Sequence, residues 1–557
     1  MKTLALLVTL AACTTGTDLP AARFANAPIV TKVNDRLDVP VQPATREFMP
    51  SLYNVRGLIH RRITRGLELR RSQRALGVNA LDEVPDSTWF TNRIGIRDLT
   101  PEEIQRGPLT GDSPELHRPW TVRSTKAGGA TIGFVIVDAR GIKYILKFDD
   151  TGASEQQTAI DVIVNRLLWA AGYNVPEDEI VYFRDEDLVV APDAAIKDGE
   201  GNKVGPLDRK GLEDRLAQID HGADGRIRGL VSRWIAGKTV GGHASEGTRR
   251  DDPNDVIPHE LRRDLRGAFP VFAWVDHVDV HEGNFVDSWI TDAADKARHY
   301  LVHYFIDFGR SLGGMALSAT DWHRGHTYVV DFADIGRSLV TFGLVDPAWK
   351  DRPRYPAKQV ASFDATTFVP GDWHPDWPSY VPFLTSDRFD KFWGAKLVAR
   401  FTPEQIAAAI EAGRLREPEA AQYLLDTLLE RRQLTLKYWF ARVAPIDAPA
   451  VSAAGDLVDL CFDDLAVRYG VAAAATTSYA LQAHDWHGRV LAPAVSAPAS
   501  LSGHACARLE PASVDDDGGY TIVRITVRRP GFTGSTLIHL GRDPATGSPR
   551  VIGLWRE

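Results

Sequence analysis

The sequence predicts an α+β protein in which paired strands come first, helices follow, and a small, mostly β domain ends the chain. The runs Thr131–Val137 and Ile142–Phe148 are typical of the two strands of a hairpin. The segment Thr402–Gln405 combines an N-cap threonine, a proline and a capping-box glutamine, which predicts a helix start. Alternation from Tyr520 to Val527 indicates strands again.

Length and composition predict several units with ordinary globular cores. The chain has 557 residues, of which 44% are hydrophobic and 25% charged, and its net charge is −8. The acidic balance gives no electrostatic reason to expect nucleic-acid binding. Composition changes divide the chain into a signal segment 1–13, an N-terminal extension 14–117, a β-rich part of the core 118–236, a helical part 237–442, and a mostly β C-terminal domain 443–557.

The first residues have the pattern of a processed signal. Lys2 precedes an apolar run from Leu4 to Leu10, and a small-residue cleavage site ends at Cys13. This pattern resembles the lipobox of bacterial lipoproteins, in which the cysteine is lipidated. The resemblance implies a cell-envelope protein that meets the membrane only through a lipid anchor. The alternative is an ordinary secretion signal with a chance cysteine, and the run is too short to span a bilayer.

Two cysteines remain if Cys13 is lipidated. Cys461 and Cys506 lie near the C-terminus, where an oxidising compartment would allow them to pair. Sequence does not give the distance between their Cα atoms, so a disulfide and two separate thiols both stay open.

Local signals order the first part of the core. Asp138–Gly141 predicts the turn between the two strands, and Lys147 stands near the end of the second. Ser154, with Gln157 at the capping-box position, predicts the start of a helix that Gly172 ends.

Polar residues with a chemical rationale gather in the helical part. Asp279 precedes Asn284 by five residues, and Asp307-Phe308-Gly309 follows some twenty residues later. Phosphoryl transfer needs a carboxylate beside the acceptor hydroxyl and oxygen ligands for Mg²⁺ at the phosphates. These residues supply that set.

The spacing Asp279-x-His281-x-x-Asn284, followed by Asp307-Phe308-Gly309, resembles the paired motifs of atypical kinases, including the phosphatidylinositol kinases and HipA-like serine/threonine kinases. The resemblance implies a two-lobed kinase-like core that uses ATP or another nucleotide with Mg²⁺. By the same resemblance, Asp279 is the catalytic carboxylate and His281 supports the catalytic loop. Asn284 and Asp307 would bind the metal.

The preceding strands and helix fit the same resemblance. Lys147 occupies the place of the phosphate-binding lysine, and Asp161 that of its acidic partner, with Glu155 as the rival. We expect Asp161 to be the partner, because it lies in mid-helix and can face the strand. The nucleotide loop would contain Gly128, Gly129 and Gly133, although it lacks the G-x-G-x-x-G of ordinary kinases.

Other functions stay open. The expected compartment is poor in ATP, so a catalytically inactive pseudokinase or binding lipoprotein is the first alternative. The dense run Asp276-His277-x-Asp279-x-His281 also suits a metal-dependent hydrolase, with His303, His323 and His326 as further ligand candidates. A third interpretation makes the same residues caps of a turn between helices. The acceptor, whether protein, glycan, lipid or metabolite, is not identified by the sequence.

Overall fold

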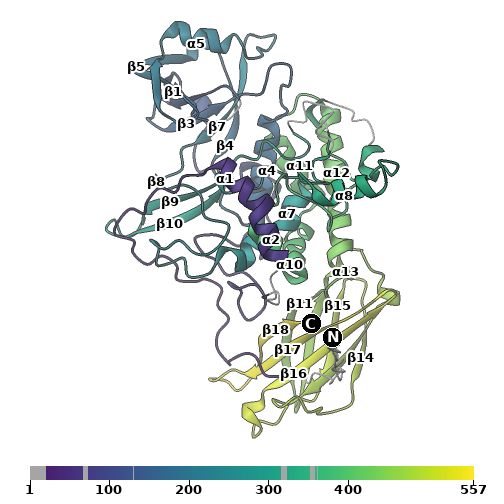
Figure 1. Ribbon diagram of the computed structural model, residues 1–557. Helices are drawn as coiled ribbons and strands as arrows, with labels where there is room; N and C mark the ends of the chain where they lie inside the picture. The colour runs from purple at the N-terminus through teal and green to yellow at the C-terminus, as the bar shows by residue number, and fades with distance from the viewer. Residues whose placement is uncertain (1–20, 67–72, 129–130, 315–322, 352–357, 361) are drawn as a thin grey trace, which may run out of the picture. The chain divides into compact units, whose positions relative to one another are not determined.

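The computed structural model describes residues 21–66, 73–128, 131–314, 323–351, 358–360 and 362–557. They form two units, Val30–Val443 and Ala444–Glu557, and the described part of Met1–Ile29 belongs to the second (Figure 1). The segment 14–117, predicted as one extension, is therefore divided between the units. The reason is local: Phe24 packs among buried C-terminal residues, and the backbone N–H groups of Arg23 and Phe24 donate to the Tyr520 hydroxyl.

A seven-stranded sheet opens the core, with strand order β4-β7-β3-β2-β1-β5-β6. Neighbouring strands are antiparallel except β1 and β5, which are parallel. The strands are β1 (Trp120–Thr125), β2 (Gly133–Val137), β3 (Lys143–Lys147), β4 (Asp178–Phe183), β5 (Leu188–Lys197), β6 (Lys203–Pro206) and β7 (Ile227–Arg233).

The hairpin β2–β3 confirms the first strand prediction. Phe134 pairs with Leu146 across it, and both side chains are fully buried in the core of the sheet. Such residues each contribute about 1.5–3 kcal/mol through burial. In the turn, Asp138 accepts hydrogen bonds from the backbone N–H groups of Arg140 and Ile142.

The helix α4 (Thr158–Ala171) starts later than the sequence predicted. Its N-cap is Gln157 and not Ser154, and no side chain of the N-cap residue bonds the helix. Asp149 does this instead, because its carboxylate accepts from the N–H groups of Glu155, Gln157 and Thr158. The predicted end is confirmed, since the Gly172 N–H bonds the carbonyl of Leu168.

Gly172 also admits a neighbour from the N-terminal part of the chain. Its φ is +124°, and a Cβ at this position would lie 2.3 Å from the ring of Phe90. Phe90 is fully buried and forms a β-bridge with Tyr173. Glycine is therefore required both by the backbone and by the close contact.

The part 237–442, predicted to be helical, contains a further three-stranded sheet of order β10-β9-β8. Its strands are β8 (Lys238–Thr239), β9 (Phe285–Thr291) and β10 (His299–Phe305). The main helices here are α7 (Ala268–Trp274), α10 (Arg388–Ala399), α11 (Pro403–Ala412) and α12 (Pro418–Trp439). The capping box at Thr402 and Gln405 is present as predicted.

The N-terminal extension contributes short helical segments to the same unit: α1 (Pro50–Val55), the π-helical Arg56–His60, α2 (Arg61–Gly66) and α3 (Pro101–Arg106). The capping box at Thr100 and Glu103, which opens α3, is present. Elsewhere in the extension, Asp35 accepts hydrogen bonds from the backbone N–H and the hydroxyl of Thr88 at 2.6 and 2.8 Å.

The C-terminal unit contains two antiparallel sheets, of order β11-β12-β15 and β14-β13-β16-β17-β18. The strands are β11 (Ile446–Ala454), β12 (Leu457–Asp464), β13 (Ser478–His484), β14 (Val495–Pro498), β15 (His504–Leu509), β16 (Thr521–Arg529), β17 (Phe532–Arg542) and β18 (Pro549–Arg556). A short helix, α13 (Leu465–Arg468), follows β12.

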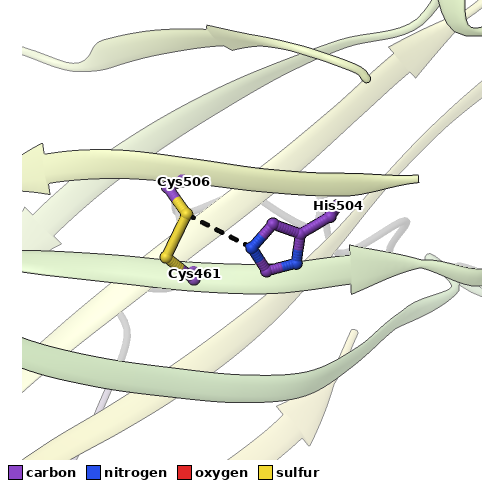
Figure 2. A group of neighbouring side chains, drawn as sticks. All are labelled: Cys461, His504 and Cys506. Atoms are coloured by element: carbon purple, nitrogen blue, oxygen red, sulfur yellow. Dashed lines mark hydrogen bonds between the residues drawn. A yellow bond between two sulfur atoms is a disulfide. The ribbon is translucent and has the colours of Figure 1, made fainter. Parts of the chain in front are cut away.

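The open question of the two cysteines is settled by the first of these sheets. Cys461 and Cys506 face each other across β12 and β15 and form a disulfide, with His504 beside it (Figure 2). Among the described residues, we find no helix both long and apolar enough to cross a bilayer.

Candidate functional site

Lys147, at the end of β3, joins the sheet to the motif residues of the following part of the core. Its Nζ lies 3.3 Å from Asp307 Oδ1 and 3.6 Å from Asp161 Oδ2. Burial alone would lower the pKa of Lys147, but the two carboxylates outweigh it and hold that pKa well above its usual range. The lysine is therefore a fixed positive charge.

Asp161 reaches Lys147 from the first turn of α4, and not from mid-helix as expected, because the helix begins late. Burial raises the pKa of the Asp161 carboxyl to about 7, against the opposing effect of Lys147. The rival Glu155 precedes the helix and forms an ion pair with Arg416. Asp178 on β4 is a further buried acid here, and burial raises its pKa.

Asp279 lies in the loop between α7 and β9. Its Oδ1 is 3.4 Å from His281 Nε2 and 3.5 Å from Arg310 Nη1. Burial would raise the pKa of Asp279, but the hydrogen bond from His281 and the charge of Arg310 hold it well below its usual range. Asp279 is thus an ionised carboxylate of low basicity.

The tautomer of His281 follows from its hydrogen bonds. The ring Nδ1 accepts from the backbone N–H of Gly283 at 3.0 Å, so it carries no proton. The proton of the neutral ring then lies on Nε2, which faces Asp279. His281 accordingly orients the Asp279 carboxylate as a donor.

Asn284 is tied to both motifs. The Asn284 side-chain amide donates to the backbone carbonyl of Asp279 at 2.9 Å. The backbone carbonyl of Asn284 accepts from the Ile306 N–H at 3.0 Å. Phe285, the first residue of β9, pairs with Phe305, the last residue of β10. Asn284 and Asp307 therefore lie together at the open end of the hairpin, away from its turn. The Asp307 side chain is 56% exposed. The positive charge of Lys147 lowers the pKa of the Asp307 carboxyl.

Arg310 is the site residue that sequence reasoning missed most clearly. It bridges Asp279 and Asp376, with its Nη2 2.6 Å from Asp376 Oδ2. Its place directly after Gly309 was the available signal. Asp376 lies 66 residues further on and had none.

The predicted nucleotide loop is described only in part. Gly129 lies outside the described residues, Gly128 has φ +69°, and Gly133 pairs with Lys147 in the β2–β3 hairpin. A Cβ on Gly133 would lie 2.7 Å from the Leu146 carbonyl oxygen, so the close strand contact requires glycine. Lys126 donates to Thr131 across this loop, and burial lowers its pKa to about 8.

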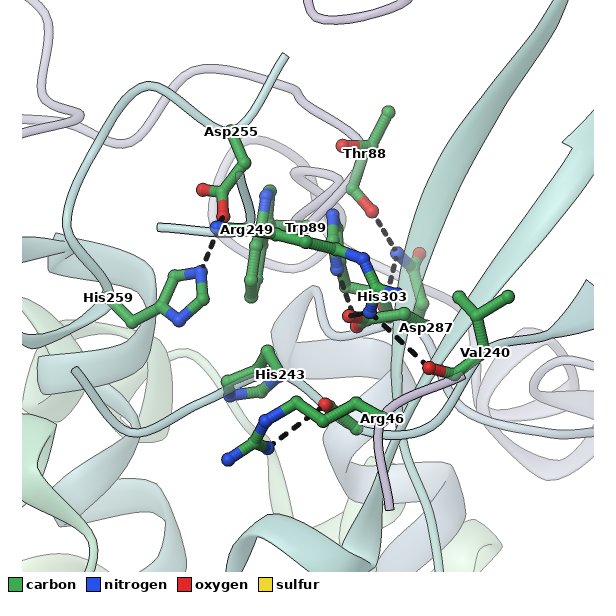
Figure 3. A network of polar contacts seen from close by, with 12 residues as sticks. Arg46, Thr88, Trp89, Val240, His243, Arg249, Asp255, His259, Asp287 and His303 are labelled. Carbon is green, nitrogen blue, oxygen red and sulfur yellow. Dashed lines mark hydrogen bonds and ion pairs between the residues drawn. The ribbon is translucent and has the colours of Figure 1, made fainter. Parts of the chain in front are cut away.

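Asp287 on β9 and His303 on β10 belong to a buried polar network that also includes residues outside the hairpin (Figure 3). His303 Nδ1 lies 2.7 Å from Asp287 Oδ1, and Arg249 is 3.3 Å from the other oxygen. Trp89 of the extension stacks on the His303 ring at 3.5 Å. The described contacts of His303 are therefore structural: it pairs with Asp287 and stacks on Trp89.

The segment Asp276–His281, considered above as a metal-ligand run, contains no group of three close ligand atoms among the described residues. His277 is buried, its Nδ1 lies 2.9 Å from the Ser311 hydroxyl, and burial lowers its pKa to about 4. In the described part of the chain, the one group of three close His, Cys or carboxylate ligands is Cys461, His504 and Cys506. Its two sulfurs are joined in the disulfide.

No family model matches the chain, and no curated protein matches it. Three solved structures are similar. The Helicobacter pylori proinflammatory kinase CtkA has 13% identity and a TM-score of 0.30, over 57% of this chain and 93% of that one. The Golgi casein kinase with Mn/ADP bound has 10% identity and a TM-score of 0.28, over 58% and 72%. The Rio2 kinase–ADP/Mg²⁺–phosphoaspartate complex of Chaetomium thermophilum has 15% identity and a TM-score of 0.20, over 56% and 72%.

Proposed function

We propose that the chain is a kinase-like phosphotransferase that uses ATP or another nucleoside triphosphate with Mg²⁺. One observation carries the proposal: Lys147, Asp161 and Asp307, which come from three separate segments, meet within 3.6 Å of the lysine nitrogen. Asn284, bonded to the Asp279 backbone and to Ile306, lies at the same end of the hairpin.

The residues suit a magnesium–nucleotide complex. Asp307 and Asn284 offer hard oxygen ligands, and the Asp307 carboxylate is open to solvent. When bound, Mg²⁺ would neutralise charge on the phosphate oxygens. Lys147 would bind phosphate as a point charge, and Asp161 would hold its side chain in place.

Asp279 would orient the acceptor hydroxyl and accept its proton. Its lowered pKa makes it a weak base, which suits this reaction because a loose phosphoryl transition state depends mainly on positioning and electrostatics. His281 and Arg310 would fix the carboxylate while this occurs. The candidate acceptors are hydroxyl groups of proteins, glycans, lipids and metabolites.

A binding protein without turnover is the second candidate, and the observation that favours it is the pairing of Asp279 with Arg310. The ion pair with Arg310 and the contact with His281 both use Oδ1 of Asp279 and make this carboxylate less basic toward an acceptor. In either case we propose that lipidated Cys13, which lies outside the described residues, holds the protein in the cell envelope.

Nucleotide binding tests the site. Calorimetry with ATP and GTP, with and without Mg²⁺, should show magnesium-dependent binding by wild type. Lys147→Ala and Asp307→Asn should each weaken it at least about tenfold, because each removes a charge that faces phosphate or metal. Lys210→Ala is the control, since that lysine pairs with Asp214 on an exposed helix face. Binding that ignores magnesium and both site variants would refute the proposal.

A further inference from the structure

The loop of residues 279–285, called the catalytic loop below, contacts a segment that lies more than two hundred residues earlier in the chain. Arg46 forms an ion pair with Glu282, 236 positions away, and also donates to the Gly242 carbonyl at 3.2 Å. The Glu282 side chain is only 5% exposed. Its other oxygen accepts from the backbone and hydroxyl of Ser245, both at 2.6 Å.

An aromatic contact continues the same interface. The Phe48 ring stacks on His281, with centroids 4.9 Å apart and planes 6° from parallel. Tyr53 packs edge-on against Phe48 at 5.3 Å, and its hydroxyl lies 3.3 Å from Ser245 Oγ. Tyr53 is 7% exposed, so this packing is buried.

Three glycines make the close approach possible. A Cβ on Gly283 would lie 2.5 Å from the Phe48 ring. A Cβ on Gly242 would meet the Glu282 carbonyl oxygen at 2.2 Å, and one on Gly241 would meet the Arg46 carbonyl oxygen at 2.0 Å. No side chain fits at these positions: Gly283 and Gly241 admit the extension, and Gly242 admits the backbone of Glu282, whose side chain the extension pairs with.

We infer that Arg46, Phe48 and Tyr53 form a clasp that positions the catalytic loop for transfer, and that Phe48 sets the plane of the His281 ring. This inference rests on the proposed function. His281 donates from Nε2 to Asp279 while Nδ1 accepts from Gly283, so a rotated ring would lose both bonds. Phe48 covers one face of the ring and prevents that rotation. Phe48 is therefore a positioning residue that acts through His281.

The clasp also explains a buried charge on the loop. Glu282 lies next to His281, and a buried carboxylate is costly unless it is paired. Arg46 supplies the pairing charge from the extension. Docking of the extension therefore stabilises the loop conformation seen here, in addition to the two hydrogen bonds that Ser245 donates to Glu282.

Two readouts on the full chain test the inference. Phe48→Ala should lower kcat with saturating nucleotide by about 10- to 100-fold, because small misplacements of reacting groups have effects of that size. Nucleotide Kd should stay within about threefold, because Lys147 and Asp307 are untouched. Phe48→Tyr should restore kcat, since it keeps the stacked ring. Met49→Ala is the matched control, because Met49 is the next residue and is 58% exposed.

Hydrogen exchange of the peptide over residues 279–285 gives a readout that needs no turnover. Phe48→Ala should speed exchange there at least about tenfold, and Met49→Ala should not. Unchanged exchange in Phe48→Ala would overturn the clasp, as would equal losses of kcat, nucleotide affinity and melting temperature. Faster exchange in a protein whose wild type shows no transfer would support the clasp and contradict the proposed function.

Discussion

Asp161 shows how burial and one nearby cation set the behaviour of a single carboxylate. Burial raises its pKa from 3.8 to about 7, so the folded state binds the proton more tightly than the unfolded chain does. Its contribution to stability is therefore greatest below about pH 4 and is lost as the pH rises to about 7.

Asp161→Asn should remove this dependence. The melting temperature of wild type minus that of the variant should be larger at about pH 5 than at about pH 8, where the wild-type group is ionised. Thermal unfolding at both pH values measures it. Asp98→Asn, at a side chain that is 94% exposed, provides the control. A difference that does not change with pH would show that Asp161 does not titrate in this range.

The residues of the site divide by the kind of signal they leave in a sequence. Lys147, Asp279, Asn284 and Asp307 lie in short motifs or at a strand end, so local spacing identified them as candidates. Phe48 contacts His281 through tertiary packing alone, and a single sequence carries no record of a contact across more than two hundred positions.

At the scale of elements, the N-terminus of α4 depends on a residue outside the helix. Asp149 accepts hydrogen bonds from the backbone N–H groups of Glu155, Gln157 and Thr158. It also accepts from the Thr158 hydroxyl at 2.7 Å and forms an ion pair with Arg228 at 3.4 Å. The first turn of α4 also carries Asp161 toward Lys147.

Asp149→Ala should destabilise the chain by about 1–3 kcal/mol, because buried donors lose their acceptor. It should also weaken nucleotide binding, since a frayed first turn no longer holds Asp161 at Lys147. Urea unfolding and calorimetry measure the two effects, and Asp98→Ala, at a side chain that is 94% exposed, is the control. Full stability in Asp149→Ala would mean that Gln157 caps the helix unaided.

The same elements show why sequence patterns succeed or fail. The capping box at Thr402 was predicted correctly, because all its atoms lie within four residues. The start of α4 was wrong, because Ser154 and Gln157 imitate a capping box while Asp149 supplies the bonds. The strands β9 and β10 were missed, because each buries residues on both faces and so lacks clear alternation.

Attachment of the whole protein to the membrane is proposed to depend on Cys13, which precedes every described helix and strand. Cys13→Ser should release the protein from the membrane fraction and leave its fold intact, because every described helix and strand follows the lipobox. Cell fractionation with circular dichroism of the released protein measures both. Membrane association that persists in the variant would place the anchor elsewhere in the chain.

The arrangement of units was predictable from composition only at its coarsest. The C-terminal domain was expected to begin at residue 443, and the C-terminal unit begins at Ala444. Residues 21–29 were assigned to the extension, yet they pack on the C-terminal unit through Phe24 and Tyr520. Long-range packing of a short segment leaves no periodic signal, so composition could not reveal it.

The proposed function is tested most directly by comparing turnover with nucleotide affinity in Asp279→Asn. Asp279 contacts His281 and Arg310 and is proposed to act on the acceptor, whereas Lys147 and Asp307 are proposed to hold the nucleotide. Asp279→Asn should therefore abolish nucleotide-dependent phosphate transfer in the presence of Mg²⁺ while nucleotide Kd stays within about threefold of wild type. Transfer at the wild-type rate in Asp279→Asn, or no transfer by wild type across the four acceptor classes, would contradict it.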